Sequence, residues 1–307
     1  MKKVFFLSCV FLLLLYINVD ASAFDFRIIT PSVISTGYSS AALDEDVETA
    51  FYNPAMLSYI PNWQMMFSYG SPFGLYGTNE FVAAISQPYS YGFAGSLALA
   101  NLMLADGDNT DSRWMVLYSL SGFISFFSLG GQIGYVSDTN TIFGEPQQRQ
   151  QIRGDIGVAL KFPNDIVEIG GFTEDLFVVN VATNTWQVNM VKDNIPKVNL
   201  SLKLGYNWKD DMGFSLYTGI RKALNRVLDV EIMAGGELKL WTVSLRAGYG
   251  VNVDFPNGLN AVNYDTIYQR ITLGAGIEMS GYKVDYVYSI DPVSLPQQLT
   301  SLKIEWR

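Results

Sequence analysis

Apolar and polar side chains alternate with a period of two along most of the chain. In the clearest run one face carries Trp241, Val243, Leu245, Ala247 and Tyr249, with Thr242, Ser244, Arg246 and Gly248 between them. Alternate residues of a β-strand point to opposite faces of its sheet, so this pattern predicts strands. The runs reach about ten residues and are separated by turn signals such as 209–211 and 256–258, which predicts about 14 strands.

The stretch 115–137 needs separate treatment, because it contains no charged residue and a hydropathy window scores it as a helix that spans a membrane. Within it, however, Phe127, Leu129, Ile133 and Tyr135 alternate with Ser128, Gly130, Gln132 and Gly134. A helix makes no use of period-two alternation, and Ser121-Gly122 interrupts the run. The stretch is therefore predicted to form two strands joined by a tight turn.

Strands of this kind build either a soluble β-sandwich or a membrane-spanning barrel. The chain is 49% hydrophobic and only 16% charged, whereas a soluble domain usually carries about a quarter of charged residues. Long runs over nearly the whole chain favour the barrel, as do the aromatic residues at their ends, where a barrel places its interfacial girdles. We therefore predict an all-β fold, a transmembrane antiparallel β-barrel of about 14 strands.

The N-terminus has the pattern of an export signal. Lys2 and Lys3 precede an apolar run over 4–17, and Ala21-Ser22-Ala23 forms a cleavage site, which predicts a signal peptide over residues 1–23. A permanent anchor helix is disfavoured, because the run is shorter than the roughly 20 residues that a span needs. The expected location is the cell outer membrane. The net charge of −9 argues against a nucleic-acid partner.

Residues 31–61 do not alternate and are expected to form irregular structure with short helical pieces. At the start of a barrel such a segment either lies outside as an extension or folds inward as a plug. Its small and apolar residues favour the plug. The predicted organisation is therefore a signal peptide over 1–23, an N-terminal hatch over 24–61 and the barrel over 62–307.

Two sets of segments carry a resemblance to a known family. Residues 37–42 (GYSSAA), the acidic stretch after them and residues 50–57 (AFYNPAML) resemble the hatch signature of the FadL-like outer-membrane transporters, whose Asn-Pro-Ala element lies at the corresponding place. Residues 153–157, 236–238, 245–249 and 284–288 resemble more narrowly the PorV-type branch and its uncharacterised relatives. The resemblance implies a barrel with an N-terminal hatch and, in the fatty-acid branch, diffusion of hydrophobic molecules through a pocket and a side opening in the wall.

The resemblance assigns the hatch motif to Asn53, Pro54 and Ala55. Asn-Pro is also typical of a plain tight turn, so a turn and a direct role in ligand passage both remain open for this motif. The candidates to line a ligand passage are Phe51, Tyr52, Met66 and Arg246.

Charge is distributed unevenly over the predicted strands. Both faces are apolar or small over 81–99, whereas from residue 153 onward one face carries charges that include Arg221, Glu231, Glu237, Lys283 and Asp285. Lipid excludes charge, so this face is expected to point inward. A lumen with one apolar side and one side of mixed sign suits an amphipathic ligand. Alternatively the charges pair with each other and with the hatch to hold the plug, which is the interpretation we favour for most of them.

The chain has no histidine, which excludes a Ser-His-Asp triad, an HExxH zinc site and a His-ligated haem. No catalytic residue, cofactor or metal site is predicted. The function we favour is passive transport of hydrophobic or amphipathic small molecules such as long-chain fatty acids, with outer-membrane lipid and a hydrophobic ligand as partners. The alternative is a PorV-like binding or shuttle component that engages secretion-system proteins. A barrel enzyme acting on lipid has the least support, because no nucleophile with a base stands out.

Overall fold

The structure is a computed structural model, and it describes residues 30–37, 39, 46–71, 78–106, 109–124, 126–142, 145–162, 166–181, 188–190, 196–209, 212–224, 229–254, 267–290 and 296–306. The predicted signal peptide and part of the predicted hatch, residues 24–29, 38 and 40–45, lie outside this range.

Within the described residues, three short helices precede the strands: α2 (Pro31–Ser35), η1 (Val47–Phe51) and η2 (Pro54–Tyr59). The strands are β1 (Trp63–Ser71), β2 (Thr78–Ser90), β3 (Phe93–Asp106), β4 (Asn109–Ile124), β5 (Phe127–Ile142), β6 (Glu145–Lys161), β7 (Val167–Glu174), β8 (Phe177–Val181), β9 (Val188–Met190), β10 (Lys197–Lys209), β11 (Met212–Ala223), β12 (Asp229–Leu240), β13 (Val243–Asp254), β14 (Ile267–Met279), β15 (Tyr282–Ile290) and β16 (Gln297–Trp306).

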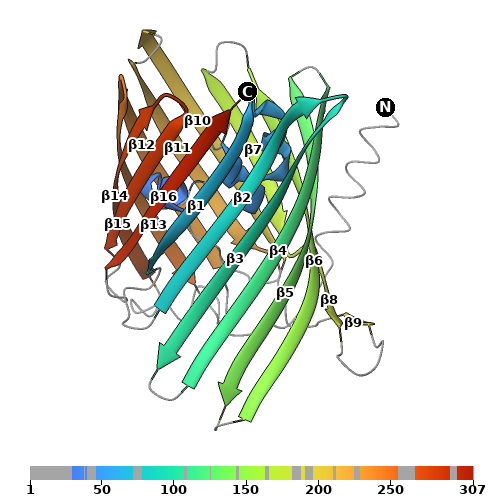
Figure 1. Ribbon diagram of the computed structural model, residues 1–307. Coiled ribbons are helices and arrows are strands. Elements are labelled where there is room, and N and C mark those ends of the chain that lie inside the picture. The colour runs from blue at the N-terminus through green and yellow to red at the C-terminus, as the bar shows by residue number, and fades with distance from the viewer. Residues whose placement is uncertain are drawn as a thin grey trace.

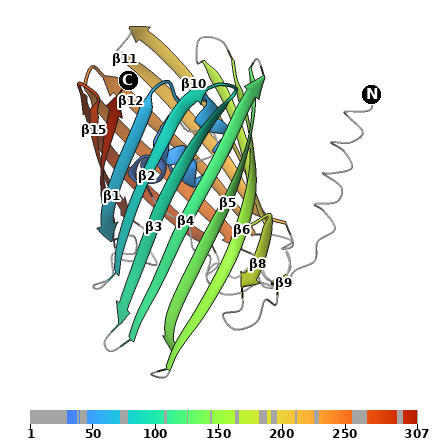
Figure 2. The same ribbon diagram turned by 45° about the vertical axis from the view of Figure 1, so that its right-hand side comes forward.

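Fourteen of these strands form a closed antiparallel barrel (Figure 1). Strands β1–β7 and β10–β16 follow one another around the ring, and β16 pairs with β1 to close it, from Trp63 opposite Trp306 to Ser71 opposite Gln298. Strands β8 and β9 lie outside the ring, because β8 pairs with β6 and then with β9 (Figure 2). The prediction of an all-β barrel of about 14 strands is confirmed.

The stretch 115–137 forms the facing parts of β4 and β5, which pair from Ser112 opposite Thr139 to Ile124 opposite Phe127. The prediction of two strands is therefore confirmed. Among the described residues, no helix is both long enough and apolar enough to cross a membrane. The strand predicted from Trp241 onward begins two residues later, at Val243, because Trp241 lies in the turn before β13 with a φ of 53°.

The outer surface of the barrel carries a belt of apolar side chains. All fourteen strands of the ring contribute to it with exposed residues: Phe67, Phe81, Leu97, Val116, Leu129, Val158, Ile169, Leu200, Leu216, Ile232, Leu245, Leu273, Val284 and Leu302. A soluble barrel would expose such a surface to water at a large cost, whereas a bilayer requires it.

The two rims of the barrel differ. One rim, which we call the turn rim, carries the turns at Tyr91-Gly92, Trp241-Thr242 and Ser280-Gly281, the start of β1 and the end of β16. At this rim the rings of Trp63 and Trp306 stack with their centroids 6.4 Å apart. At the opposite rim β3–β6 extend well beyond the rest of the wall (Figure 2).

The described part of the hatch lies inside the barrel (Figure 1). Helix α2 contacts β13–β16, η1 contacts β1–β4 and η2 contacts β2–β6, so the segment crosses the lumen from one wall to the other. Local capping explains its short helices. The Asp46 side chain accepts a hydrogen bond from the Glu48 amide at the start of η1, and Asn53 caps η2, which begins with Pro54.

Candidate functional site

The Asn-Pro-Ala element attaches the hatch to the wall at β5 and β6. The Asn53 side chain accepts a hydrogen bond from the Ala55 amide at 3.1 Å and donates one to the Val158 carbonyl of β6 at 3.0 Å. The Ser128 hydroxyl of β5 donates to the Ala55 carbonyl at 2.7 Å. Asn53 therefore combines a turn with a wall contact, and it is fully buried.

Glycines make this attachment sterically feasible. Gly130 of β5 and Gly157 of β6 are directly paired and both point toward the Asn-Pro-Ala element. A Cβ atom at Gly157 would clash with the Asn53 side chain, and one at Gly130 would clash with the backbone of Pro54 and Ala55. Glycine is required here because the hatch backbone lies directly on the sheet.

A second set of glycines receives the other end of the hatch. Gly235, Gly248 and Gly274, on β12, β13 and β14, face the α2 end of the hatch, where a Cβ atom on any of them would meet residues 35–37 at less than contact distance. Gly37 itself adopts a φ of 71°, a conformation that glycine reaches without strain. The hatch is thus fitted to the wall at two places on opposite sides of the lumen.

Lys303 of β16 links the hatch to the charged wall. Its ammonium forms an ion pair with Asp46, lies 2.7 Å from Glu48, and lies 3.4 Å from Asp285 of β15. Glu48 is fully buried and also accepts a hydrogen bond from the Thr30 hydroxyl at 2.5 Å. A cation among three carboxylates compensates the desolvation that burial imposes on each of them.

The network continues along the wall through Arg246. Its guanidinium donates to Asp285 at 2.6 Å and to Glu237 of β12 at 2.8 Å. The Tyr217 hydroxyl donates to the other oxygen of Glu237 at 3.0 Å. Arg246, a predicted ligand-lining residue, is only 5% exposed, and its described partners are these wall carboxylates.

The surroundings of the hatch residue Asp46 shift the pKa of its carboxyl group. Burial by itself would raise its pKa, but the ammonium groups of Lys303 and Lys283 outweigh burial, so the pKa of Asp46 lies below its usual value. Lys283 is 3.8 Å from this carboxylate. Asp46 is therefore ionised at neutral pH and holds the hatch electrostatically.

Charges farther from the turn rim also pair within the wall. Arg221 of β11 lies 2.5 Å from Glu174 and 3.5 Å from Glu231, and Arg270 of β14 lies 2.5 Å from Glu231. The interpretation that most inward charges pair with each other and with the hatch agrees with these contacts.

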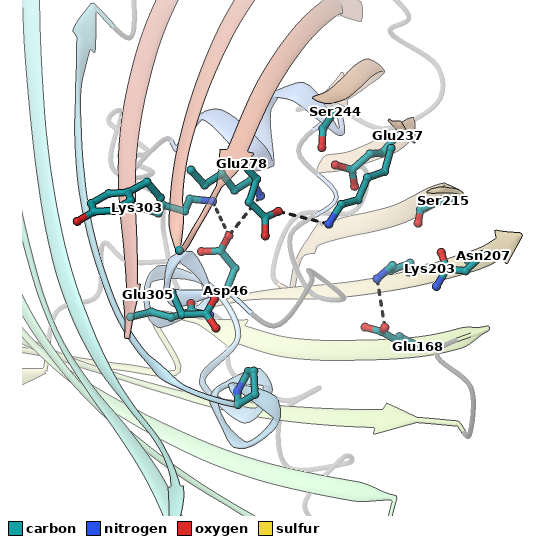
Figure 3. A pocket seen from close by; sticks show the side chains of 18 of the residues that line it. Asp46, Glu168, Lys203, Asn207, Ser215, Glu237, Ser244, Glu278, Lys303 and Glu305 are labelled. Carbon is teal, nitrogen blue, oxygen red and sulfur yellow. Dashed lines mark hydrogen bonds and ion pairs between the residues drawn. The ribbon is translucent and has the colours of Figure 1, made fainter. Parts of the chain in front are cut away.

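A cavity of about 370 Å³ lies at the turn rim, between the hatch and a part of the wall formed mainly by β6, β7, β10–β12 and β14–β16. Its lining is charged and of mixed sign (Figure 3), with Asp46, Lys161, Glu168, Lys203, Glu237, Lys239, Glu278, Lys283, Lys303 and Glu305. Lys203 lies 3.2 Å from Glu168, and Lys239 lies 3.3 Å from Glu278. This side of the lumen is suited to a polar or charged group.

The opposite side of the lumen is mostly apolar. Phe51 and Tyr52 of the hatch and Met66 of β1, all predicted to line a passage, are buried in one cluster with inward residues of β2–β5. Met66 is fully buried against the hatch. The four lining candidates thus divide between two environments, three in the apolar cluster and Arg246 in the ionic network.

Neither Lys303 nor Glu48 stands out in the sequence as a site residue, although both hold the hatch in place. Alternation alone indicated that Lys303 points opposite to Leu302, hence inward. The pattern did not identify its partners in the hatch, because Asp46 and Lys303 are 257 residues apart in the sequence.

Comparison with known proteins adds a likeness of fold. No family model and no curated protein matches the sequence. Among solved structures, the CymD monoaromatic hydrocarbon channel aligns with a TM-score of 0.62 and 12% identity, over 93% of this chain and 99% of that chain. A Pseudomonas aeruginosa FadL homologue aligns with a TM-score of 0.59 and 13% identity, over 93% and 99%. The Ralstonia pickettii toluene transporter TbuX aligns with a TM-score of 0.61 and 10% identity, over 93% and 100%.

At these identities the likeness is one of architecture. The chain has the barrel fold of the FadL-type transporters.

Proposed function

We propose that this protein is an outer-membrane channel for the passive passage of hydrophobic or amphipathic small molecules, with long-chain fatty acids as the class to examine first. The apolar outer belt supports a location in a bilayer. Two solved structures of similar fold, a monoaromatic hydrocarbon channel and a toluene transporter, support a hydrophobic cargo.

The two-sided lumen is the observation that carries this proposal. Between the hatch and β1–β5 most of the buried side chains are apolar or small, although Gln64 and Gln132 bind the hatch backbone. The cavity on the side of β7 and β10–β16 is instead lined mainly by charged and polar side chains. An amphipathic molecule has the same division, with an apolar part that gains from burial and a polar head that requires hydrogen bonds or charge. A uniformly polar lumen would instead favour small hydrophilic solutes.

The rims indicate an orientation. Outer-membrane barrels have short turns on the periplasmic side, so the turn rim is assigned to the periplasm. The charged cavity then faces the periplasm, below the hatch. Passage is proposed to be passive, driven by the concentration difference of the cargo.

Uptake by proteoliposomes tests the proposal. Purified protein is reconstituted into vesicles that contain a fatty-acid sensor, and the initial rate of oleate entry is compared with protein-free vesicles and with vesicles carrying an unrelated barrel of similar size. Entry faster than in both controls is expected. A rate equal to that of the unrelated barrel would overturn the proposal.

The secretion role that the narrower resemblance implies stays a prediction. Affinity capture of the protein from its native outer membrane tests it, and a protein partner recovered in stoichiometric amount would support it.

A further inference from the structure

A continuous apolar cluster leads from the middle of the hatch toward the turn rim. It includes Phe51 and Leu57 of the hatch and Ala84, Ala98 and Leu117 on the inner faces of β2, β3 and β4, and each of these side chains is at most 9% exposed. The charged residues of the cavity belong to other parts of the wall and hatch. The contact between hatch and wall along β2–β4 is therefore mostly apolar, with one hydroxyl contact between Ser58 of the hatch and Ser121 of β4 at 2.8 Å.

Three aromatic rings lie where this cluster reaches the turn rim, and we call them the mouth aromatics: Tyr59, Tyr89 and Phe123. Tyr89 packs against the cluster, and its ring contacts Phe123 edge-on with centroids 4.9 Å apart. Tyr59, the last residue of η2, lies 6.1 Å from the Phe123 ring. The hatch and two strands of the wall thus meet at one aromatic group.

Phe123 presents its ring to the lumen. It pairs directly with Ser128 of β5, whose hydroxyl binds the hatch, so both side chains lie on the inner face of the barrel. Phe123 is nevertheless 36% exposed. An inward aromatic side chain with free surface at the mouth offers contact area to a passing apolar molecule.

The mouth aromatics lie next to the charged cavity. The Lys161 ammonium is 5.7 Å from the centre of the Tyr59 ring and 3.9 Å from Glu168, and both Lys161 and Glu168 line the cavity. A molecule that leaves the space beside the hatch therefore meets two adjacent surfaces, one aromatic and one ionic. Its apolar part stays out of water only on the aromatic surface.

We propose, on the basis of the proposed function, that the apolar chain of an amphipathic cargo moves between the hatch and β2–β4 and is received by Tyr59, Tyr89 and Phe123 at the periplasmic mouth. The charged cavity takes the polar head group. The mouth aromatics are thus a binding subsite for the hydrocarbon part of the cargo.

Photo-crosslinking locates the chain directly. A fatty acid with a diazirine in the middle of its alkyl chain is bound to the intact reconstituted protein, irradiated, and mapped by peptide mass spectrometry. Crosslinks are expected on the peptides that contain Tyr59, Tyr89 or Phe123. Crosslinks confined to β12–β16, beside Lys239 and Lys283, would overturn the inference.

A matched pair of variants measures the effect on passage. Phe123→Ala removes an inward ring, whereas Phe127→Ala removes an outward ring of similar exposure, 39%, from the partner strand. Phe123→Ala is expected to lower oleate uptake and crosslinking at least threefold, and Phe127→Ala to leave both unchanged. Equal effects of the two variants, or faster uptake by Phe123→Ala, would overturn the inference.

These outcomes separate the inference from the proposed function. Uptake by the unmodified protein with crosslinks elsewhere refutes the subsite and leaves the channel intact. Absence of uptake above the unrelated barrel refutes the channel itself. Heat-modifiable migration in gels confirms that each variant is a folded barrel before it is assayed.

Discussion

At the residue scale, the Lys303 side chain is a main ionic contact between the wall and the hatch. It is 6% exposed and holds Asp46, Glu48 and Asp285, two of which belong to the hatch and one to the wall. Two other cations approach these carboxylates: Lys283 lies 3.8 Å from both Asp46 and Asp285, and Arg246 lies 2.6 Å from Asp285. Loss of the ammonium would leave buried negative charge next to the hatch.

We therefore expect Lys303→Met to destabilise hatch docking by about 3–5 kcal/mol, the usual cost of removing one partner from a buried ion pair. Ion conductance across planar bilayers measures the effect, because an undocked hatch leaves the lumen open. The control is Lys239→Met, whose pair with Glu278 is about half exposed and contributes at most about 1 kcal/mol. Conductance that is equally low in both variants would contradict this role of Lys303.

Acid is expected to release the same contact. The pKa of Asp46 is lowered in the docked state, so its contribution to docking is complete above its ordinary pKa of 3.8 and is lost as the pH falls through the lower docked value. The contribution of Asp46 to docking is thus constant between pH 5 and 8. Conductance recorded from neutral pH down to pH 3 checks this, with Asp46→Asn as the variant that loses the dependence. An unchanged acid response in Asp46→Asn would assign it to other groups.

Sequence patterns predicted the direction of these side chains and not their partners. Alternation and the exclusion of charge from lipid are local rules, and they place Arg246 on the inner face without an alignment of the whole barrel. The pairing of Arg246 with Glu237 and Asp285 depends on the register of three strands, which no single run determines. A predicted ligand contact is consequently part of a structural ion network.

At the scale of elements, glycines on the inner face of the wall allow the hatch backbone to pack directly on the strands. Gly130 and Gly157 form a directly paired, flat area under the Asn-Pro-Ala element. Inner-face glycines within strands weaken the strands themselves, since they pack no side chain. Close approach of the hatch backbone explains why they are present.

Gly157→Ala is expected to displace the Asn-Pro-Ala element and to destabilise hatch docking by about 1–3 kcal/mol, the typical cost of overpacking a tight contact. The matched control is Gly131→Ala, which adds the same methyl group on β5 at a site with no atom within 4 Å. Accessibility of an introduced Asn62→Cys thiol to a maleimide reagent, together with bilayer conductance, reports on docking. Equal behaviour of the two variants would exclude a steric role for Gly157.

Glycine pairs within a strand run, such as Gly130-Gly131 and Gly235-Gly236, are typical of close packing or a kink, but the pattern does not identify the packed partner. Short helical pieces near η1 and η2 were expected from the absence of alternation in this segment. Their placement across the lumen was not accessible from pattern, since it results from long-range contacts such as Ser58 with Ser121, 2.8 Å apart.

At the scale of the whole molecule, the lipid belt determines what the outer face tolerates. Ile133→Arg places a charge within the apolar belt and is expected to destabilise the inserted barrel by about 2–4 kcal/mol. Gln148→Arg is the control, on an exposed polar position of β6 in the part of the wall that extends past the belt. Urea-induced unfolding in lipid vesicles measures both variants. Equal stabilities would mean that Ile133 does not face lipid.

The barrel itself was predictable because lipid makes the alternation strict over nearly every strand. The position of β8 and β9 outside the ring was not predictable, because a strand that leaves the ring has the same composition as one that remains in it. The structure places the departure at Asp175, where a φ of 56° turns the chain and β8 pairs with β6 while β10 stays with β7.

The Asp46–Lys303 contact has a consequence for biogenesis. The hatch is synthesised before any strand, whereas its anchor lies on β16, the last strand, 257 residues later. The wall site around Lys303 is complete only when β16 has paired with both β15 and β1. Contacts so distant in sequence are slow to form, because the entropy of closing a long loop is lost first. We therefore expect the hatch to dock only after β16 has joined the wall, so that the newly inserted barrel passes through an open state that the hatch then seals.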